Sequence, residues 1–340
     1  MHPSIRLPAS LYQYSFDAAT APAATVDSGD VLVVETLDCF SNRLSAAAPA
    51  LREERDVLAH IGGRYNPVNQ PIFVRGAEAG DRLAVDILDI ALGGRAGLGV
   101  THVAHDWATA FGGSAFADSV APLTTFARID GEIVQLPIGG ARIEFTAKPM
   151  IGTIGTAPSG APASSLLYHP SHGGNLDCPH IRPGATVVLP VNVPGALLSL
   201  GDVHALMGDG EVTGTALETS ADVKIRVRLQ KTGETALTNP RVIDADGLGA
   251  IGCASRTNLQ DNIAAAARDL VRLLQNEFAL GAADALQLVN LFGKITINQA
   301  VGHGSQRWLS VLVRILWSDL SPLESRRRHG EATSCREAVA

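Results

Sequence analysis

The feature that most constrains the fold is a series of short apolar runs, each bounded by turn residues, between about residues 30 and 230. The runs are rich in Val, Ile and Leu and end at Gly, Pro, Asp or Asn, which is typical of strands joined by turns. They include residues 31–34, 83–90, 133–138, 186–191 and 223–229. Because the strands recur at roughly ten-residue spacing without helical patterns between them, we expect an antiparallel sandwich or barrel.

The run at residues 223–229 shows the clearest strand pattern. Apolar and polar side chains alternate along it, so apolar residues point to one face and polar residues to the other. The apolar set is Val223, Ile225, Val227 and Leu229, and the polar set is Lys224, Arg226, Arg228 and Gln230. This alternation predicts a strand with one buried face and one face in solvent.

The pattern changes after about residue 255. Apolar residues at spacings of three and four predict a helix over residues 262–278, capped by Asn258 or Asp261. Gly281 is expected to separate it from a second helix at about 282–291, and a strand is expected at 294–299. The chain is therefore predicted to be mainly β, or α+β overall, with helices near its C-terminus.

We divide the chain on this basis into three parts. Residues 1–255 form a β-rich sandwich that carries the site motifs, and residues 256–320 form a helical or α+β part packed on it. Residues 321–340, which include several arginines, are expected to be a mobile, charged tail.

Composition excludes several classes of protein. With 46% apolar and 18% charged residues the chain is too hydrophobic to be disordered, and it has no apolar run long enough to cross a membrane. The 27 basic and 34 acidic residues give a net charge of −7, which offers no basic face for nucleic acid. The four cysteines lie far apart and no secretion signal is evident, so the reducing cytoplasm is expected.

The polar residues best suited to catalysis or metal binding lie in two segments, 172–177 (HGGNLD) and 201–211 (GDVHALMGDGE). In an extended segment, residues two apart point the same way, which places Asp202 and His204 on one face. A turn at residues 208–210 can then bring Glu211 back toward them. Imidazole and carboxylate groups that converge from separate segments are typical ligands of a divalent metal, and two imidazoles favour Zn²⁺.

Simpler readings of these residues stay open. Asn, Asp and Gly are common in turns, so any one of them can be structural. Glu35 and Asp38 can mark a strand end rather than a ligand pair, and His102 and His105 fit either a metal pair or hydrogen-bonded loop histidines. Cys178 can be a nucleophile, but a buried small side chain is the simpler reading.

Four stretches of the chain resemble the acetamidase/formamidase family of small-amide hydrolases. They are residues 66–81, 149–157, 172–177 and 189–218. The resemblance extends in order over about residues 25–300, although residues 91–130 and those from 302 onward match the family pattern poorly. It implies a jelly-roll-like antiparallel β-sandwich with a smaller α+β part, and hydrolysis of formamide, acetamide or a related short amide to a carboxylate and ammonia.

The resemblance also implies which residues form the site. The family's polar motif falls on His172, Asp177, Asp202, His204, Glu211 and Glu218, and its early acidic pair falls on Glu35 and Asp38.

From this set we predict the following roles. The metal ligands are His172, Asp177, His204 and Asp38, with zinc favoured and calcium or another divalent ion as alternatives. The catalytic residues are Glu211, which moves protons, with Asp202 and Glu218. The substrate and its developing oxyanion are bound by Gly173, Gly174 and Asn175. The wall of a small acyl pocket is formed by Leu197, Leu198, Leu206 and Met207.

Two other functions remain open. The divergent segment 91–130 can reshape the pocket for another linear or cyclic amide or a carbamoyl compound. A β-sandwich can also bind a metal or ligand without catalysis, because a fold does not fix a function. We further expect a homodimer or higher homo-oligomer, with the helices after residue 260 as the contact face.

Overall fold

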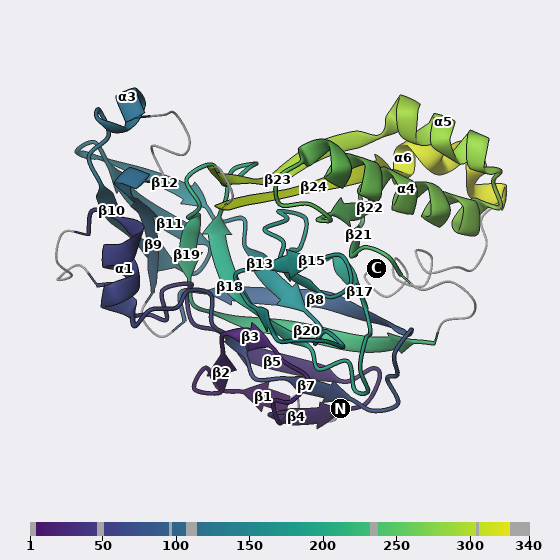
Figure 1. Cartoon of the computed structure of the whole chain (residues 1–340), viewed down its shortest axis with the longest axis horizontal. Helices are drawn as coiled ribbons and strands as arrows, with labels where there is room; N and C mark the ends of the chain where they lie inside the picture. Colours follow the sequence, from purple (N-terminus) through teal and green to yellow (C-terminus); the bar gives the residue numbers. More distant parts are fainter. Residues whose placement is uncertain are drawn as a thin grey trace.

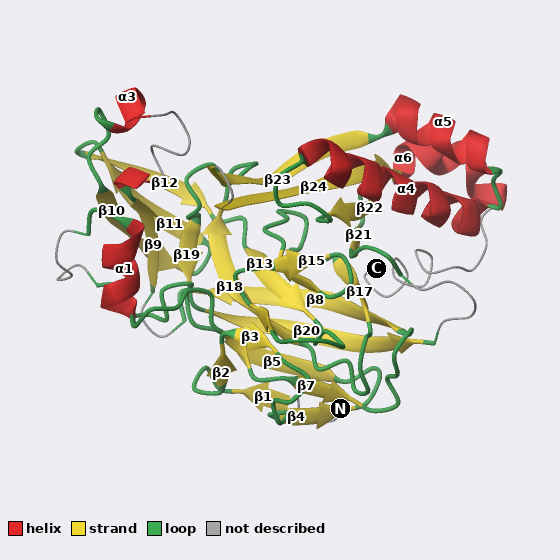
Figure 2. Cartoon of the chain, viewed as in Figure 1, coloured by secondary structure: helices red, strands yellow, loops and turns green. Residues whose placement is uncertain are grey.

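The computed structural model describes residues 5–45, 51–94, 97–106, 114–231, 237–303 and 306–326. Two large β-sheets make up most of the molecule; the C-terminal helices gather at one end of it, and the short helices at residues 54–61 and 114–117 lie at the other end (Figure 1). Strands outnumber helices throughout the first two thirds of the chain (Figure 2). The prediction of a mainly β protein with C-terminal helices is confirmed.

The first sheet has nine strands, and every neighbouring pair is antiparallel except the parallel pair at one edge. In spatial order the strands are β1 (Ile5–Leu7), β5 (Val31–Glu35), β20 (Ala221–Gln230), β8 (Arg82–Leu92), β17 (Thr186–Pro190), β21 (Arg241–Ile243), β22 (Gly247–Gly252), β24 (Gln306–Leu316) and β23 (Lys294–His303).

The second sheet has eleven strands and is antiparallel. Its main path runs β12 (Ala141–Thr146), β11 (Ile133–Ile138), β10 (Leu123–Asp130), β9 (Leu98–Val103), β19 (Leu217–Thr219), β18 (Ser199–Leu206), β13 (Met150–Gly155), β16 (Gly173–Asn175) and β15 (Tyr168–His169). Off this path, β6 (Val68–Asn69) pairs with β18 and with β2 (Tyr12–Gln13). Two small sheets pair β3 (Ser15–Phe16) with β14 (Ala163–Ser164) and β4 (Ala24–Val26) with β7 (Ile72–Val74).

The main hydrophobic core lies between the two large sheets. Val223 and Ile225 of β20 pack in one cluster with Ile151 of β13 and Leu200 of β18, and all four are fully buried. Lys224 on the opposite face of β20 is exposed. The alternation predicted for this strand is therefore confirmed, and burial of one apolar face explains its register.

The C-terminal helices cover one end of the first sheet. Helix α4 (Leu259–Phe278) begins after Asn258, whose side chain accepts a hydrogen bond from the amide of Gln260 at 3.0 Å. Its apolar face packs with α5 (Ala282–Phe292) against β22 and β24, through residues such as Leu270 and Leu274. Both predicted helices are confirmed, and Asn258 rather than Asp261 is the cap.

The shorter helices are α1 (Glu54–Ile61), α3 (Ser114–Ala117), α6 (Trp317–Leu320) and the 3₁₀ helix η1 (Ser321–Arg326). Residues 321–326 of the predicted tail thus form η1, and residues 327–340 lie outside the described residues. Within the described ranges, no helix is both long enough and apolar enough to cross a bilayer.

The first sheet continues across the predicted domain boundary. Strand β22 lies before residue 255, and it pairs with β24, which lies after it. The chain beyond residue 255 therefore adds a β-hairpin to the sheet as well as the helices. The division into residues 1–255 and 256–320 stays a prediction.

Candidate active site

A cavity of about 590 Å³ opens beside the second sheet and ends at a group of buried carboxylates. It draws side chains from α1, from the strands around β18 and from the β23–β24 hairpin. Its walls are formed by Cys39, Phe40, Glu53, Glu54, Arg55, Leu58, Tyr65, Asn66, His102, Asp106, Leu166, Asn175, Asp177, Asp202, Glu211, Gly214, Thr215, Glu218, Arg256, Gln299, Val301 and Trp308.

The sheet itself brings three of the polar residues together. Asp202 and His204 lie two positions apart on β18, and Glu218 of β19 is the cross-strand partner of His204. Asp177 follows β16, which is joined to β18 through β13. The i, i+2 spacing predicts that Asp202 and His204 share one face, and strand pairing adds Glu218 and Asp177, which are distant from them in sequence.

The imidazole of His204 lies at the centre of this group. Its Nε2 atom is 3.4 Å from Oε2 of Glu218, 3.5 Å from Oδ1 of Asp202 and 3.8 Å from Oδ1 of Asp177. His204 and Asp177 are 1% exposed and Glu218 is 2% exposed. The four groups are therefore almost fully buried at the end of the cavity.

Two acceptor atoms in this group have no donor. Oδ1 of Asp177 and Oε2 of Glu218 are buried without a hydrogen-bond partner among the described residues. Leaving a buried carboxylate oxygen unpaired costs stability, so native proteins do so mainly at functional sites. These two oxygens face His204 and are oriented to bind something else.

Polar side chains hold the carboxylates in place. Asn66 donates from Nδ2 to Oδ2 of Asp202 at 2.8 Å and to Oδ1 of Asn175 at 3.1 Å. The hydroxyl of Thr153 donates to Oδ1 of Asn175 at 2.6 Å. On the other side of the centre, Gln299 donates from Nε2 to Oδ2 of Asp177. In Asp202 and in Asp177 the bonded atom is Oδ2, and Oδ1 is left facing His204.

The backbone around the centre is strained. Asp177, Asp202 and Glu211 all adopt positive φ angles, of 42°, 57° and 42° respectively. Few residues other than glycine do so, and in folded proteins such conformations concentrate at functional sites, where they aim a side chain.

Burial and mutual repulsion shift the pKa values of these groups. Burial and the charges of neighbouring carboxylates raise the pKa of Asp177 and of Glu218 well above the usual values. Burial raises the pKa of Glu211 to about 8, partly offset by the charge of His204. Burial alone would lower the pKa of His204, but Glu218 and the other carboxylates raise it well above its usual value. A positive charge added to the centre would favour the ionised carboxylates.

The C-terminal hairpin fixes the segment that carries Glu211. Gly210 forms a parallel bridge with Gln299 of β23, and its carbonyl accepts the amide of Ala300 at 2.7 Å. Gln299 thus contacts the Asp177 side chain while its backbone neighbours hold the turn before Glu211. The part of the chain after residue 255 completes the site.

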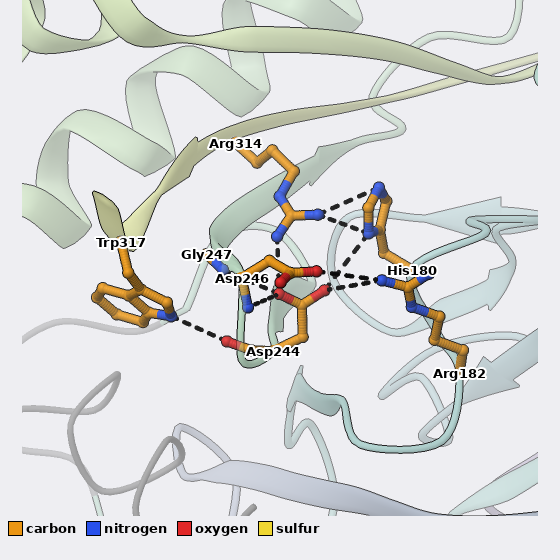
Figure 3. Close-up of polar contacts among 7 residues, drawn as sticks. All are labelled: His180, Arg182, Asp244, Asp246, Gly247, Arg314 and Trp317. Carbon is orange, nitrogen blue, oxygen red and sulfur yellow. Dashed lines mark hydrogen bonds and ion pairs between the residues drawn. The ribbon is translucent and has the colours of Figure 1, made fainter. Parts of the chain in front are cut away.

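A second polar network holds the loop that follows Asp177 (Figure 3). Oδ1 of Asp244 accepts from Arg314 of β24 at 2.7 Å and from the amide of Gly247 at 2.9 Å, and Arg314 also contacts His180 at 2.7 Å. Burial would raise the pKa of Asp244, but the bond to His180 and the charge of Arg314 lower it to about 2. The network links the loop at His180 to β21, β22 and β24.

Several residues predicted for the site lie together. The cavity is lined by Asp177, Asp202, Glu211, Glu218 and Asn175. His204 is not among the lining residues, but it contacts the carboxylates of Asp177, Asp202 and Glu218.

Other predicted residues lie outside this group. Asp38 and His172 are buried but belong to neither group of potential metal ligands found among the described residues. Oδ1 of Asp38 accepts the amide of Asn42 at 2.6 Å, and burial raises the pKa of Asp38 to about 6. Glu35 forms an ion pair with Arg6 at 2.7 Å and lies outside the cavity wall.

Gly173 and Gly174 lie within β16 and are not among the residues that line the cavity. Both have positive φ, and a Cβ at Gly174 would lie 2.2 Å from the carbonyl oxygen of Leu167. This close packing between strands accounts for both glycines. Their role in binding an oxyanion stays a prediction.

The four residues predicted for the acyl-pocket wall, including Met207, do not line this cavity. Leu197 and Leu198 are buried away from the cavity, and Leu206 packs with a separate apolar cluster. The apolar wall instead comes from Phe40, Tyr65 and Trp308, together with Leu58, Leu166 and Val301. The reason is that the cavity opens toward α1 and the C-terminal hairpin, a direction that strand patterns do not reveal. His102 and Asp106 of the divergent segment also line it, and Trp107 lies outside the described residues.

Sequence reasoning missed three residues of the site: Cys39, Asn66 and Gln299. Cys39 has no second cysteine near it in the sequence, yet one carboxylate oxygen each of Asp202 and Glu218 lies within 4.8 Å of its Sγ atom. Asn66 opens one of the segments that resemble the family, which was a usable signal. Gln299 had none, since a single glutamine in a strand carries no pattern.

Comparison with known proteins points to one family. Residues 14–165 and 167–246 match the sequence model of the Acetamidase/Formamidase family. A protein of Schizosaccharomyces pombe that is named provisionally as a formamidase is 27% identical over 273 residues, which cover 64% of this chain and 64% of that protein. The match thus spans less than two thirds of that relative's length.

Two solved structures share the whole architecture. An acetamidase from Bacillus halodurans superposes with a TM-score of 0.79 and 33% identity, over 94% of this chain and 99% of its own. A predicted acetamidase/formamidase from Thermoanaerobacter tengcongensis gives a TM-score of 0.81 and 32% identity, over 96% and 100% of the two chains.

Proposed function

The chain belongs to the acetamidase/formamidase family, and on that premise we propose that it hydrolyses the carbon–nitrogen bond of short-chain amides, giving a carboxylate and ammonia. The observation that carries the proposal is the convergence of buried carboxylates on His204 at the end of a cavity, with oxygens of Asp177 and Glu218 left without donors. Such a group is costly to bury and supports catalysis rather than folding.

A divalent cation fits this group. His204 and the facing oxygens of Asp202 and Glu218 would hold it, with Asp177 as a further ligand. Nitrogen and carboxylate oxygen are ligands that zinc and other divalent ions accept, and their positive charge would offset the buried carboxylates. When bound, the cation would polarise the amide carbonyl and acidify a water molecule. This set keeps Asp177 and His204 of the predicted ligands and leaves out Asp38 and His172.

Glu211 is the proposed proton carrier. It lines the cavity, and one of its oxygens lies within 4.8 Å of ligand atoms of Asp177 and His204. A carboxylate there can take a proton from the attacking water and pass it to the departing nitrogen, because an amide leaves only when its nitrogen is protonated. The raised pKa of Glu211 suits a group that must both accept and donate near neutral pH.

Gln299 is the proposed acceptor for the substrate's amide hydrogens. Its Nε2 donates to Asp177, which fixes the orientation of the side-chain amide, and its Oε1 is buried without a partner in the part of the chain that the structure describes. An unsubstituted amide carries N–H donors that Oε1 can bind. This contact would hold the leaving nitrogen near Glu211.

A larger amide is the second candidate substrate. A water molecule occupies about 30 Å³ of liquid. On that scale, the cavity of about 590 Å³ has room for an amide much larger than formamide or acetamide. Tyr65 and Trp308 on its wall could contact an apolar substituent.

A homo-oligomer in the cytoplasm is the proposed form of the protein. Leu286 and Leu291 of α5 and Ile295 of β23 are 56%, 69% and 54% exposed, which makes this face a candidate contact between copies. Light scattering on the purified protein tests it, and a monomer at all concentrations would count against it.

The activity is tested by ammonia release from formamide, acetamide, propionamide and a longer aryl amide. The assay is repeated after chelation and after zinc is restored. We expect chelator-sensitive release, and the substrate order decides between the two substrate classes. Absence of release from every amide by protein that holds its metal would contradict the proposal.

A further inference from the structure

Cys39 places a thiol beside the acidic centre, and the proposed reaction does not use it. Its side chain is 6% exposed and lines the cavity. Its Sγ atom and one carboxylate oxygen each of Asp202 and Glu218 all lie within 4.8 Å of one another. Ligands of a single metal ion have such separations, because each lies about 2.0–2.3 Å from the ion.

The backbone holds the thiol in this position. The side chains of Asp38 and Asn42 bond to each other's backbone amides, at 2.6 and 2.9 Å, and so close the turn that contains Cys39. The carbonyl of Cys39 accepts the amide of Asn66 at 3.0 Å, and the Asn66 side chain donates to Asp202. The thiol and the Asp202 carboxylate are therefore positioned through one shared residue.

A second observation points to a ligand at the same place. Oε2 of Glu218 is buried, has no donor within the described ranges, and lies 3.4 Å from Nε2 of His204. A cation bound between these side chains would stabilise a Cys39 thiolate. Cys178 and Cys253, in contrast, lie in the apolar core between the sheets.

We propose that Cys39 binds the divalent cation as a thiolate and makes this centre select zinc over calcium and magnesium. Asp202 and Glu218 would be ligands of the same ion. Thiolate is a soft ligand that binds zinc or cobalt strongly and calcium or magnesium poorly. On binding, the Sγ–H proton passes to solvent as the sulfur–metal bond forms. The inference rests on the proposed function, in that it assumes a cation at this centre.

Cobalt provides a test that does not depend on activity. The full-length protein is stripped with chelator and reloaded with Co²⁺, and its near-ultraviolet spectrum is recorded for a thiolate-to-cobalt charge-transfer band. We expect the band in the wild type and in Cys253→Ser, whose buried thiol lies elsewhere. We expect Cys39→Ser to bind cobalt without the band, and to lose about tenfold or more in zinc affinity with little change in calcium affinity.

A measurement on the wild type covers the case in which Cys39→Ser does not fold. X-ray absorption at the zinc edge should show one sulfur at about 2.3 Å. Only nitrogen and oxygen around the zinc, or a charge-transfer band that persists in Cys39→Ser, would overturn the inference. Amide hydrolysis is assayed separately on the same samples. Activity with an all-nitrogen-and-oxygen site defeats the inference alone, and a sulfur-bound zinc without activity defeats only the proposed reaction.

Discussion

A methyl group at Gly152 would lie 2.5 Å from Oδ1 of Asp177, so this glycine lets β13 run directly beneath the acidic centre. The same atom would lie 2.7 Å from Oδ2 of Asp202 and 2.8 Å from the Asp202 carbonyl oxygen. The backbone at Gly152 is not left-handed, so glycine is required here only because a side chain would have no space. The positions of both carboxylates are thus set by a residue with no side chain.

Gly152→Ala should therefore damage the site. We expect kcat/KM to fall at least about tenfold and the free energy of unfolding to fall by about 1–3 kcal/mol, because a packed region must move apart. Amide hydrolysis and urea denaturation measure the two effects. Gly160→Ala is the control, since no atom of the described residues lies within 4 Å of its added Cβ. Equal activity in the two variants would show that the carboxylates need not lie where they do.

Glu211→Gln should separate catalysis from metal binding. The amide keeps the shape of the side chain but cannot carry a proton, so we expect kcat to fall by about 10²–10⁴-fold. Metal content, measured by elemental analysis, should stay at the wild-type level. Asp209→Asn changes an exposed neighbour and should be neutral. Loss of metal in Glu211→Gln would reassign Glu211 as a ligand.

Local patterns were sufficient to predict much of the fold. The alternation at β20 and the three-and-four spacing in α4 both indicate which face is buried. Val223 and Leu270, on those faces, are buried in the structure. Strand pairing over long distances carries no such signal. That β24 would continue the sheet beside β22 could not be read from either segment.

The candidate site was predictable to the same extent. Asp202 and His204 lie two apart on one strand, so their proximity follows from strand geometry alone. Glu218 and Asp177 join them through pairing of separate strands. Cys39 and Gln299 arrive from a turn and from the C-terminal hairpin, and only the folded chain brings them to the centre.

Arg314→Met should destabilise the protein by about 3–5 kcal/mol, because it leaves the buried Asp244 without its main cation. Both side chains of this pair are 7% exposed. The comparison is Arg6→Met, which breaks the exposed pairs with Glu35 and Asp222 and should cost far less stability, because water screens exposed charges. Urea denaturation measures both. Similar losses in the two variants would mean that the network in Figure 3 contributes little to stability.

His172 should make stability depend on pH. Burial, with a smaller effect of His169, lowers the pKa of His172 to about 4, against about 6.5 in an unfolded chain. As pH falls, His172 is therefore protonated in the unfolded state before it is protonated in the folded state. The contribution of neutral His172 to stability is intact above about pH 6.5 and is lost as pH falls toward 4. At pH 5 the loss should be about 2 kcal/mol relative to pH 7.5.

The His172→Gln variant lacks this titration and should lose correspondingly less stability between pH 7.5 and 5. Denaturation curves at the two pH values measure the difference, and His60→Gln, at an exposed position on α1, serves as control. A wild type and a His172→Gln variant with parallel pH dependence would show that His172 is not neutral in the folded protein.

Gln299→Met should weaken substrate binding. Methionine has a similar length but offers no acceptor for the substrate amide, so we expect KM to rise about tenfold, which corresponds to about 1.4 kcal/mol for one hydrogen bond. Because Gln299 also donates to Asp177, kcat should fall as well, by a smaller factor. An N,N-dimethyl amide has no N–H to donate and should lose little with this change. If both substrates lose equally, Gln299 acts through Asp177 alone, and its Oε1 does not contact the leaving nitrogen.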